Sequence, residues 1–174
     1  MPAPVFVDTN VLVYARDAGE PAKQPRAASW LEHLWHEQLG RTSTQVLSEY
    51  YVTVTRKLMP GLPRDEAWDD VLALMTWSPH PIDESLLERA REIERRYDLT
   101  WWDSLIVGAA QLQGCPLLLS EDLHDGGIYG SVTVRSPFTL VFGEPASAYT
   151  AAVRAVSRHP PRGRPRRMKP VVSA

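Results

Sequence analysis

The stretch Val5-Phe6-Val7-Asp8-Thr9-Asn10 decides the fold. Three apolar residues that favour β-structure lead into an acidic residue, and a helical pattern of apolar residues begins at Val11. This pattern is typical of a buried parallel strand that ends at a carboxylate. In open parallel α/β sheets, ligands bind beyond the carboxyl ends of the strands. The stretch therefore predicts a functional acid, Asp8, at that edge of a sheet.

The rest of the chain predicts alternating helices and strands around this first strand. Strands are expected over residues 4–8, 41–43, 116–120 and 131–134, and helices over about 11–17, 22–39, 45–58, 65–77, 83–97 and 101–113. The segment 138–142 is expected to be an edge strand or a packing segment. The apolar face of the second helix is expected to contain Ala27, Ala28, Leu31, Leu34, Trp35 and Leu39. Alternating strands and helices predict an α/β fold, a parallel-sheet α/β/α sandwich in a single domain over residues 1–144.

The charges divide the chain into two parts. All 21 acidic residues lie at or before Glu144, whereas seven of the 19 basic residues follow it, so residues 1–144 carry 12 basic residues and a net charge of -9. The extension 145–174 is basic and rich in Pro and Arg. It is expected to be disordered, and it is also suited to binding a phosphate backbone.

The chain is expected to be a cytoplasmic protein with no membrane segment. Its single cysteine, Cys115, excludes a disulfide within one chain and indicates a reducing compartment. Neither a signal peptide nor a run of about 20 apolar residues is present in the sequence.

Four acids occupy structurally special positions. Asp8 ends the first strand, Glu49 lies early in the third helix, Asp103 begins the last helix, and Asp122 follows the apolar strand 116–120. Parallel strands end at one edge of the sheet, and the helices that follow them begin there, so the four carboxylates can meet in one crevice. Three of them also have a plainer interpretation: Asp103 fits a Thr-x-x-Asp capping box that begins at Thr100, Glu49 could be a solvated helix residue, and Asp122 could be a turn residue. Asp8 has no evident structural task.

Clustered carboxylates repel one another unless a cation compensates their charge. Oxygen ligands without an accompanying His or Cys cluster favour Mg²⁺ or Mn²⁺ over Zn²⁺. Such an ion lowers the pKa of a bound water and holds a phosphodiester for in-line attack. The acids therefore predict metal-assisted phosphodiester hydrolysis.

With these motifs the chain resembles the PIN-domain endoribonucleases, and within them the VapC-type toxins of bacterial VapBC toxin–antitoxin pairs. The resemblance covers roughly residues 4–142. It rests on Val7-Asp8-Thr9-Asn10-Val11-Leu12-Val13-Tyr14, Ser48-Glu49-Tyr50-Tyr51, Leu99-Thr100-Trp101-Trp102-Asp103-Ser104-Leu105-Ile106 and Leu118-Leu119-Ser120-Glu121-Asp122-Leu123-His124-Asp125-Gly126.

The resemblance implies a role for each acid. Asp8 and Asp103 would be the main metal ligands, Asp122 would lie close to the metal, and Glu49 would orient or deprotonate the attacking water. Asp125 would not ligate the metal directly. The resemblance further implies supporting contacts from Thr9, Asn10 and Ser120. It also implies an RNA substrate, a homodimer and a small inhibitory antitoxin.

Three other functions remain open at this point. A haloacid-dehalogenase-like phosphatase needs a second acid two residues after its nucleophile, and Asn10 stands there instead. A PIN domain could be a non-catalytic scaffold, but all four acids are present. A PIN nuclease could also process RNA without an antitoxin. The aromatic pairs Tyr50-Tyr51 and Trp101-Trp102 are expected to pack in the core or at a dimer interface rather than to stack on RNA bases.

Overall fold

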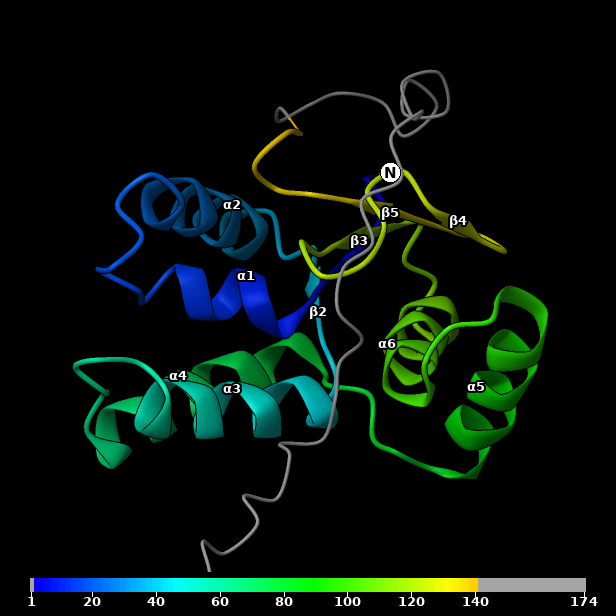
Figure 1. Cartoon of the computed structure of the whole chain (residues 1–174), viewed down its shortest axis with the longest axis horizontal. Helices are drawn as coiled ribbons and strands as arrows, with labels where there is room; N and C mark the ends of the chain where they lie inside the picture. Colours follow the sequence, from blue (N-terminus) through cyan, green and yellow to red (C-terminus); the bar gives the residue numbers. More distant parts are fainter. Residues whose placement is uncertain (1, 141–174) are drawn as a thin grey trace, which may run out of the picture.

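A five-stranded sheet forms the centre of the molecule (Figure 1). The computed structural model describes residues 2–140. The strand order is β2-β1-β3-β5-β4, and every neighbouring pair is parallel except β4 and β5. The strands are β1 (Val5–Val7), β2 (Gly40–Arg41), β3 (Leu117–Leu119), β4 (Ile128–Tyr129) and β5 (Val132–Arg135).

Helices cover the sheet on both sides, which confirms the predicted α/β/α sandwich (Figure 1). Helices α1 and α2 lie on one side, and α6 lies on the other with α5 packed outside it. Helices α3 and α4 form a hairpin that packs against α1. The bounds are α1 (Thr9–Tyr14), α2 (Gln24–His36), α3 (Thr44–Arg56), α4 (Arg64–Leu74), the short 3₁₀ helix η1 (Met75–Trp77), α5 (Glu84–Tyr97) and α6 (Trp101–Leu112).

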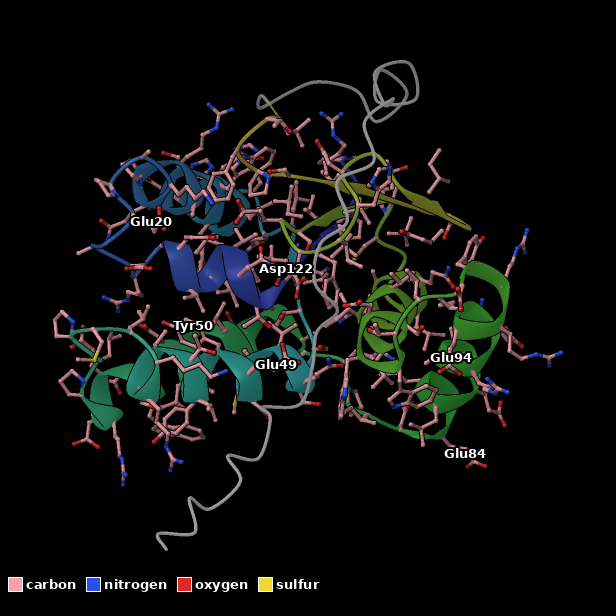
Figure 2. All side chains as sticks on the ribbon, in the orientation of Figure 1. Glu20, Glu49, Tyr50, Glu84, Glu94 and Asp122 are labelled. Atoms are coloured by element: carbon pink, nitrogen blue, oxygen red, sulfur yellow. The ribbon has the colours of Figure 1, made fainter. Side chains whose placement is uncertain are left out.

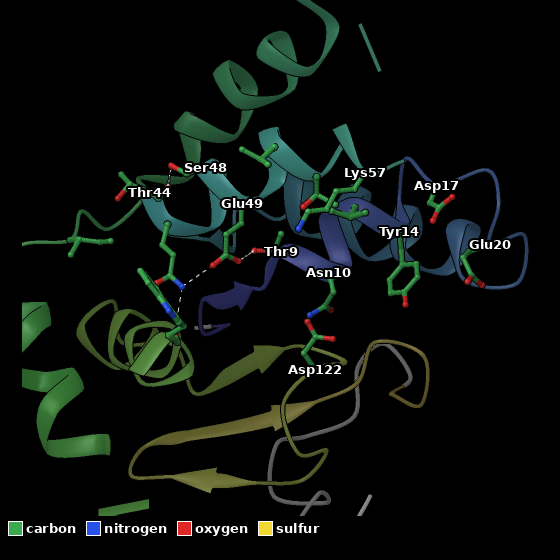
Figure 3. Close-up of a pocket in the computed structure, with 16 residues that line it drawn as sticks. Thr9, Asn10, Tyr14, Asp17, Glu20, Thr44, Ser48, Glu49, Lys57 and Asp122 are labelled. Carbon is green, nitrogen blue, oxygen red and sulfur yellow. Dashed lines mark hydrogen bonds between the residues drawn. The ribbon is translucent and has the colours of Figure 1, made fainter. Parts of the chain in front are cut away.

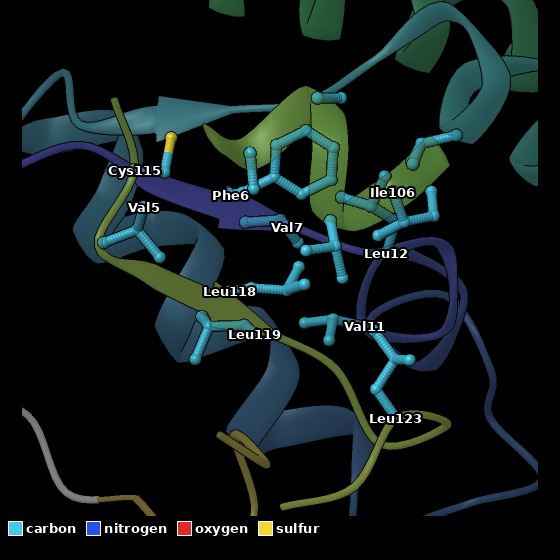
Figure 4. Close-up of a cluster of buried hydrophobic side chains, with 14 of the residues drawn as sticks. Val5, Phe6, Val7, Val11, Leu12, Ile106, Cys115, Leu118, Leu119 and Leu123 are labelled. Carbon is cyan, nitrogen blue, oxygen red and sulfur yellow. The ribbon is translucent and has the colours of Figure 1, made fainter. Parts of the chain in front are cut away.

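The core surrounds β1 and β3, the two central strands. Phe6, Val7, Leu118 and Leu119 are fully buried, because helices cover both faces of a parallel sheet (Figure 4). Burial of large apolar side chains from both strands fixes their position against α1 and α6. The loops that carry the polar residues therefore begin from a rigid base.

Some sequence expectations differ from the structure, and others concern residues outside the described part of the chain. Strand β4 was not expected, and it pairs with β5 as an antiparallel hairpin. Residues 138–140 form no strand, and the rest of the expected segment 138–142 lies outside the described residues. The predicted domain boundary at 144 and the basic extension 145–174 also lie outside them. None of the helices within residues 2–140 is long and apolar enough to span a bilayer.

The buried face of α2 is rotated relative to the expected one. Trp30, which was not among the expected residues, is 5% exposed, and its indole Nε1 donates a hydrogen bond to the Pro137 carbonyl at 3.0 Å. Trp35, which was expected inside, is 39% exposed. A pattern of apolar residues permits either face, and the position of the segment around Pro137 selects the one that buries Trp30.

The thiol of Cys115 is buried in the core, and burial raises its pKa from its ordinary value of 9.0 to about 12 despite the opposing charge of Arg41 (Figure 4). We expect native protein to resist alkylation by iodoacetamide near neutral pH and unfolded protein to react. The unfolded thiol loses its proton at a lower pH than the folded one. The free energy of unfolding should therefore fall as pH rises from about 9 to about 12.

Chemical denaturation at increasing pH measures this slope, and Cys115→Ala provides the control. The variant should show a shallower decline, with the remaining slope caused by buried tyrosines such as Tyr50, whose pKa is also raised by burial. Rapid labelling of the native thiol would contradict the expectation.

Candidate active site

The register of β1 and β3 brings two distant polar residues together. Val7 pairs with Leu119, and the backbone N–H of Asp8 donates to the Leu119 carbonyl at 3.0 Å. The next residues along the two strands, Asp8 and Ser120, therefore lie side by side although 112 positions separate them. The carboxyl edge of the sheet is thus the place where this pair is fixed.

Asp8 is completely buried, and both of its carboxylate oxygens accept hydrogen bonds. It is the N-cap of α1, and its Oδ1 accepts a hydrogen bond from the Thr9 N–H at 2.7 Å. Its Oδ2 accepts from the Ser120 hydroxyl at 2.7 Å and from the Asn10 amide at 3.2 Å. Three donors therefore fix the orientation of this carboxylate.

Glu49 approaches the same edge from α3. Its Oε2 accepts from the Thr9 hydroxyl at 2.8 Å, and its Oε1 accepts from the Gln45 amide at 3.0 Å. Thr9 therefore connects Glu49 to the residue that caps α1. Ser43, whose hydroxyl caps α3, fixes the start of that helix and with it the position of Glu49 one turn later.

Asp103 lies in the first turn of α6 and is 9% exposed. The Thr100 hydroxyl accepts from the Asp103 N–H at 3.2 Å and donates to its Oδ2 at 2.8 Å, so Asp103 closes the N-terminal turn with Thr100. The capping contribution that the sequence suggested is therefore present. The Gln45 amide, which binds Glu49, also lies 3.4 Å from the Trp102 carbonyl, so Asp103 is close to the Glu49 end of the site.

Asp122 lies across an open cavity of about 780 Å³ from Glu49 (Figures 2 and 3). Its backbone N–H donates to the Ser120 hydroxyl at 3.2 Å, which holds the start of the loop after β3. Figure 3 shows Thr9 and Glu49 on one wall and Asn10 and Asp122 on the other. The structure thus gathers Glu49 and Asp122 at the cavity wall, with Asp8 buried behind Thr9 and Asn10.

Asn10 and Ser120 support this arrangement by contacts within the loop. The Asn10 amide oxygen accepts from the Glu121 N–H at 3.0 Å, and its nitrogen donates to Asp8. Asp125, by contrast, binds the Arg135 side chain, the Ser136 N–H and the Thr139 hydroxyl. These contacts occupy both of its carboxylate oxygens at the end of β5, which gives Asp125 a structural role.

Sequence reasoning missed one ion pair at the rim. The Lys23 ammonium contacts the Glu121 carboxylate, lies 4.6 Å from the centre of the Tyr14 ring, and has its pKa raised to about 12, chiefly by Glu121. This ion pair links the segment before α2 to the loop that carries Asp122. No local pattern signals this pair, because Lys23 and Glu121 are far apart in the sequence.

Comparisons with known proteins agree with this fold. A family model described as the PIN domain matches residues 5–124. This chain belongs to the PIN domain family. Comparison with curated proteins gives no match.

Solved structures with the same PIN fold include proteins of toxin–antitoxin systems. A toxin–antitoxin complex from Klebsiella pneumoniae is 20% identical, with 78% of this chain and 98% of that chain covered and a TM-score of 0.57. FitAB bound to an IR36 DNA fragment is 19% identical, with coverages of 80% and 99% and a TM-score of 0.61. VapC20 of Mycobacterium tuberculosis, described as a sarcin–ricin loop cleaving toxin, is 22% identical, with coverages of 68% and 91% and a TM-score of 0.51.

The donor chemistry of the PIN site suits a hard divalent cation. Glu49, Asp122 and the buried Asp8 offer carboxylate oxygens, and Asp103 lies near Glu49. Oxygen ligands of this kind match Mg²⁺ or Mn²⁺. Residues 2–140 contain no preassembled group of three or more His, Cys, Asp or Glu side chains around a metal position. Binding would therefore exchange some of the present hydrogen bonds of the carboxylates for metal contacts.

The Ser120 hydroxyl is the common partner of Asp8 and the Asp122 loop in this PIN domain, so we expect Ser120→Ala to affect both stability and activity. Loss of buried hydrogen bonds should lower the free energy of unfolding by about 1–3 kcal/mol. Loss of the contact that orients Asp8 should lower catalytic activity by roughly 10- to 100-fold. Denaturant titration and cleavage assays measure the two effects. Ser131→Ala, at an exposed serine, is the matched control, and equal behaviour of the two variants would contradict the role of Ser120.

Proposed function

We propose that this PIN domain is an Mg²⁺- or Mn²⁺-dependent endoribonuclease and the toxin of a toxin–antitoxin pair. The observation that carries the proposal is the convergence of Asp8, Glu49 and Asp122, from three separate parts of the sequence, on one edge of the sheet. An all-carboxylate site beside an open cavity suits the hydrolysis of a phosphodiester. VapC20, which shares the fold, is described as a toxin that cleaves the sarcin–ricin loop.

Each residue has a defined task in this reaction. Asp8, Asp103 and Asp122 would hold the cation. When bound, the cation supplies charge neutralisation and lowers the pKa of water. Glu49 accepts the proton of the attacking water, and the hydrogen bonds from Thr9 and Gln45 hold its two oxygens in position. Ser120 and Asn10 keep the two loops that carry Asp8 and Asp122 at a fixed separation.

The charge and the exposed surface support a protein partner and a dimer. The net charge of -9 over residues 1–144 suits a basic inhibitory segment of an antitoxin. Trp68, Leu72 and Met75 on α4 and η1 are 45–47% exposed, and such a set of apolar side chains suits a contact between two copies of the chain. We propose that the protein is a homodimer silenced by an antitoxin.

The contacts of Asn10 argue against the phosphatase function. Its amide donates to Asp8 and accepts from the backbone of Glu121, so it serves as a structural bridge and not as the second acid of a phosphatase. A nuclease that processes RNA without an antitoxin would use the same site. The presence of a neighbouring gene for a short DNA-binding protein distinguishes the two.

Inducible expression tests the proposal directly. Wild-type protein should arrest growth and generate new RNA ends, whereas Asp8→Asn should do neither at equal protein level. Co-expression of the neighbouring small protein should restore growth. Wild-type expression without toxicity or new RNA ends would overturn the toxin function, and new ends in the Asp8→Asn cells would assign the cleavage to another nuclease.

A further inference from the structure

The cavity beside the acids has two chemically different ends. Figure 3 shows Thr44 and Ser48 at one end, Asp17 and Glu20 at the other, and Glu49 between them. The Thr44 end is completed by Gln45, Ile82 and Trp102, none of which is charged. The Asp17 end carries charged side chains, the two acids and Lys57, whereas the Thr44 end presents apolar surface and neutral hydrogen-bonding groups. The uncharged end is therefore the part of the cavity suited to a nucleobase.

Trp102 provides the aromatic surface of this end. Its side chain is 41% exposed and lines the cavity, whereas its neighbour Trp101 is half-buried and packs against the core. Packing in the core, one of the two expectations for the pair, therefore holds for Trp101, whereas Trp102 lies outside the core. The position of the Trp102 indole on the cavity wall, and not its exposure alone, makes its ring available to a ligand in the site.

The backbone of Trp102 is fixed relative to the proposed catalytic base. A single side-chain amide, that of Gln45, lies 3.0 Å from Glu49 Oε1 and 3.4 Å from the Trp102 carbonyl. Trp102 also belongs to the first turn of α6, which Thr100 caps. The Gln45 side chain thus links the backbone that carries the indole to Glu49.

We propose that Trp102 stacks on the base of a nucleotide that flanks the scissile phosphate of single-stranded RNA. Proteins that bind single strands commonly combine contacts to the backbone with aromatic side chains on which bases stack. Here the carboxylates and their cation hold the phosphate, and Trp102 holds the base. The side-chain oxygens of Thr44, Gln45 and Ser48 can accept hydrogen bonds from the edge of that base, since their donor groups already bind within the protein. The proposal rests on the proposed RNA-cleaving function. It places the base of the substrate at the Thr44 end of the cavity.

Binding of short oligoadenylate to the Glu49→Gln protein, in buffer with Mg²⁺, tests the proposal without cleavage, because Asp8, Asp103 and Asp122 remain to hold the cation. Adding Trp102→Ala should weaken binding by roughly 5- to 150-fold, as expected for the loss of one stacked base. Adding Trp102→Phe should retain most of the affinity, because an aromatic ring remains. An oligonucleotide with abasic sugars should bind equally weakly to all three proteins.

The matched control is Trp35→Ala, because Trp35 on α2 is exposed to a similar extent, 39%, and does not line this cavity. It should leave RNA affinity unchanged. Thermal denaturation should show that Trp102→Ala remains folded at the temperature of the binding assay, because Trp102 is 41% exposed and lies outside the core.

Equal oligoadenylate affinity with and without Trp102→Ala would overturn the proposal. So would a Trp102→Ala protein that binds RNA normally but loses dimerisation or antitoxin binding, because the indole would then serve a protein interface. Failure of the wild-type protein to cleave RNA would refute the proposed function separately, since the binding comparison does not depend on cleavage.

Discussion

Asp8→Asn is expected to lower RNA cleavage on the order of 10³-fold while the protein remains folded. The carboxylate supplies negative charge to the proposed cation, and the amide does not. Asn is among the best N-cap residues, and its oxygen can still accept the hydrogen bond from the Thr9 N–H that begins α1. Cleavage of labelled RNA under single-turnover conditions measures the loss, and denaturant titration measures stability.

Asp98→Asn is the matched control for this substitution. It removes the same charge at an exposed residue that ends α5 with a positive φ of 54°, a conformation that Asn adopts readily. The control should keep wild-type activity. Full activity in Asp8→Asn would place the reaction elsewhere in the molecule. A large loss in both variants would instead indicate a general effect of net charge.

Removal of divalent cations should abolish cleavage completely. Without a cation the acids of the site repel a phosphodiester, and no group remains that lowers the pKa of the attacking water. Treatment with EDTA should therefore reduce cleavage to background, and Mg²⁺ or Mn²⁺ added in excess should restore it. Activity that persists in EDTA would refute a metal-dependent mechanism.

Stability gives a second measurement that does not depend on activity. A cation that binds only the folded protein should raise the free energy of unfolding by about 2.7 kcal/mol at one hundred times its dissociation constant. The effect should be largely lost in Asp8→Asn and retained in Asp98→Asn. Equal stabilisation of both variants would show that the cation binds somewhere other than the acids.

Local sequence signals were sufficient for the architecture and for the prediction of the candidate acids. The run Val5-Phe6-Val7 could be recognised as a buried strand because a strand covered on both faces needs continuous apolar residues. The Thr100–Asp103 cap follows from the geometry of a single helical turn. The meeting of Glu49 and Asp122 at one cavity follows from a general property of parallel sheets, whose strands end at the same edge.

Register and packing decided what local signals left open. The register Val7–Leu119 makes Ser120 the partner of Asp8, and the ion pair of Lys23 with Glu121 depends on how α2 packs beside the sheet. The contacts of Asp125 with β5 and the segment after it removed that acid from the site.

The sequence by itself thus determined the strand that carries Asp8, the class of fold and the set of acids. These depend on apolar periodicity and on which residues follow a strand or begin a helix. The tertiary structure decided which polar groups hold those acids, which face of α2 is buried, and that Trp102 rather than Trp101 faces the cavity. Contacts between residues distant in the chain depend on strand register and helix rotation, and no local pattern of residue types specifies either quantity.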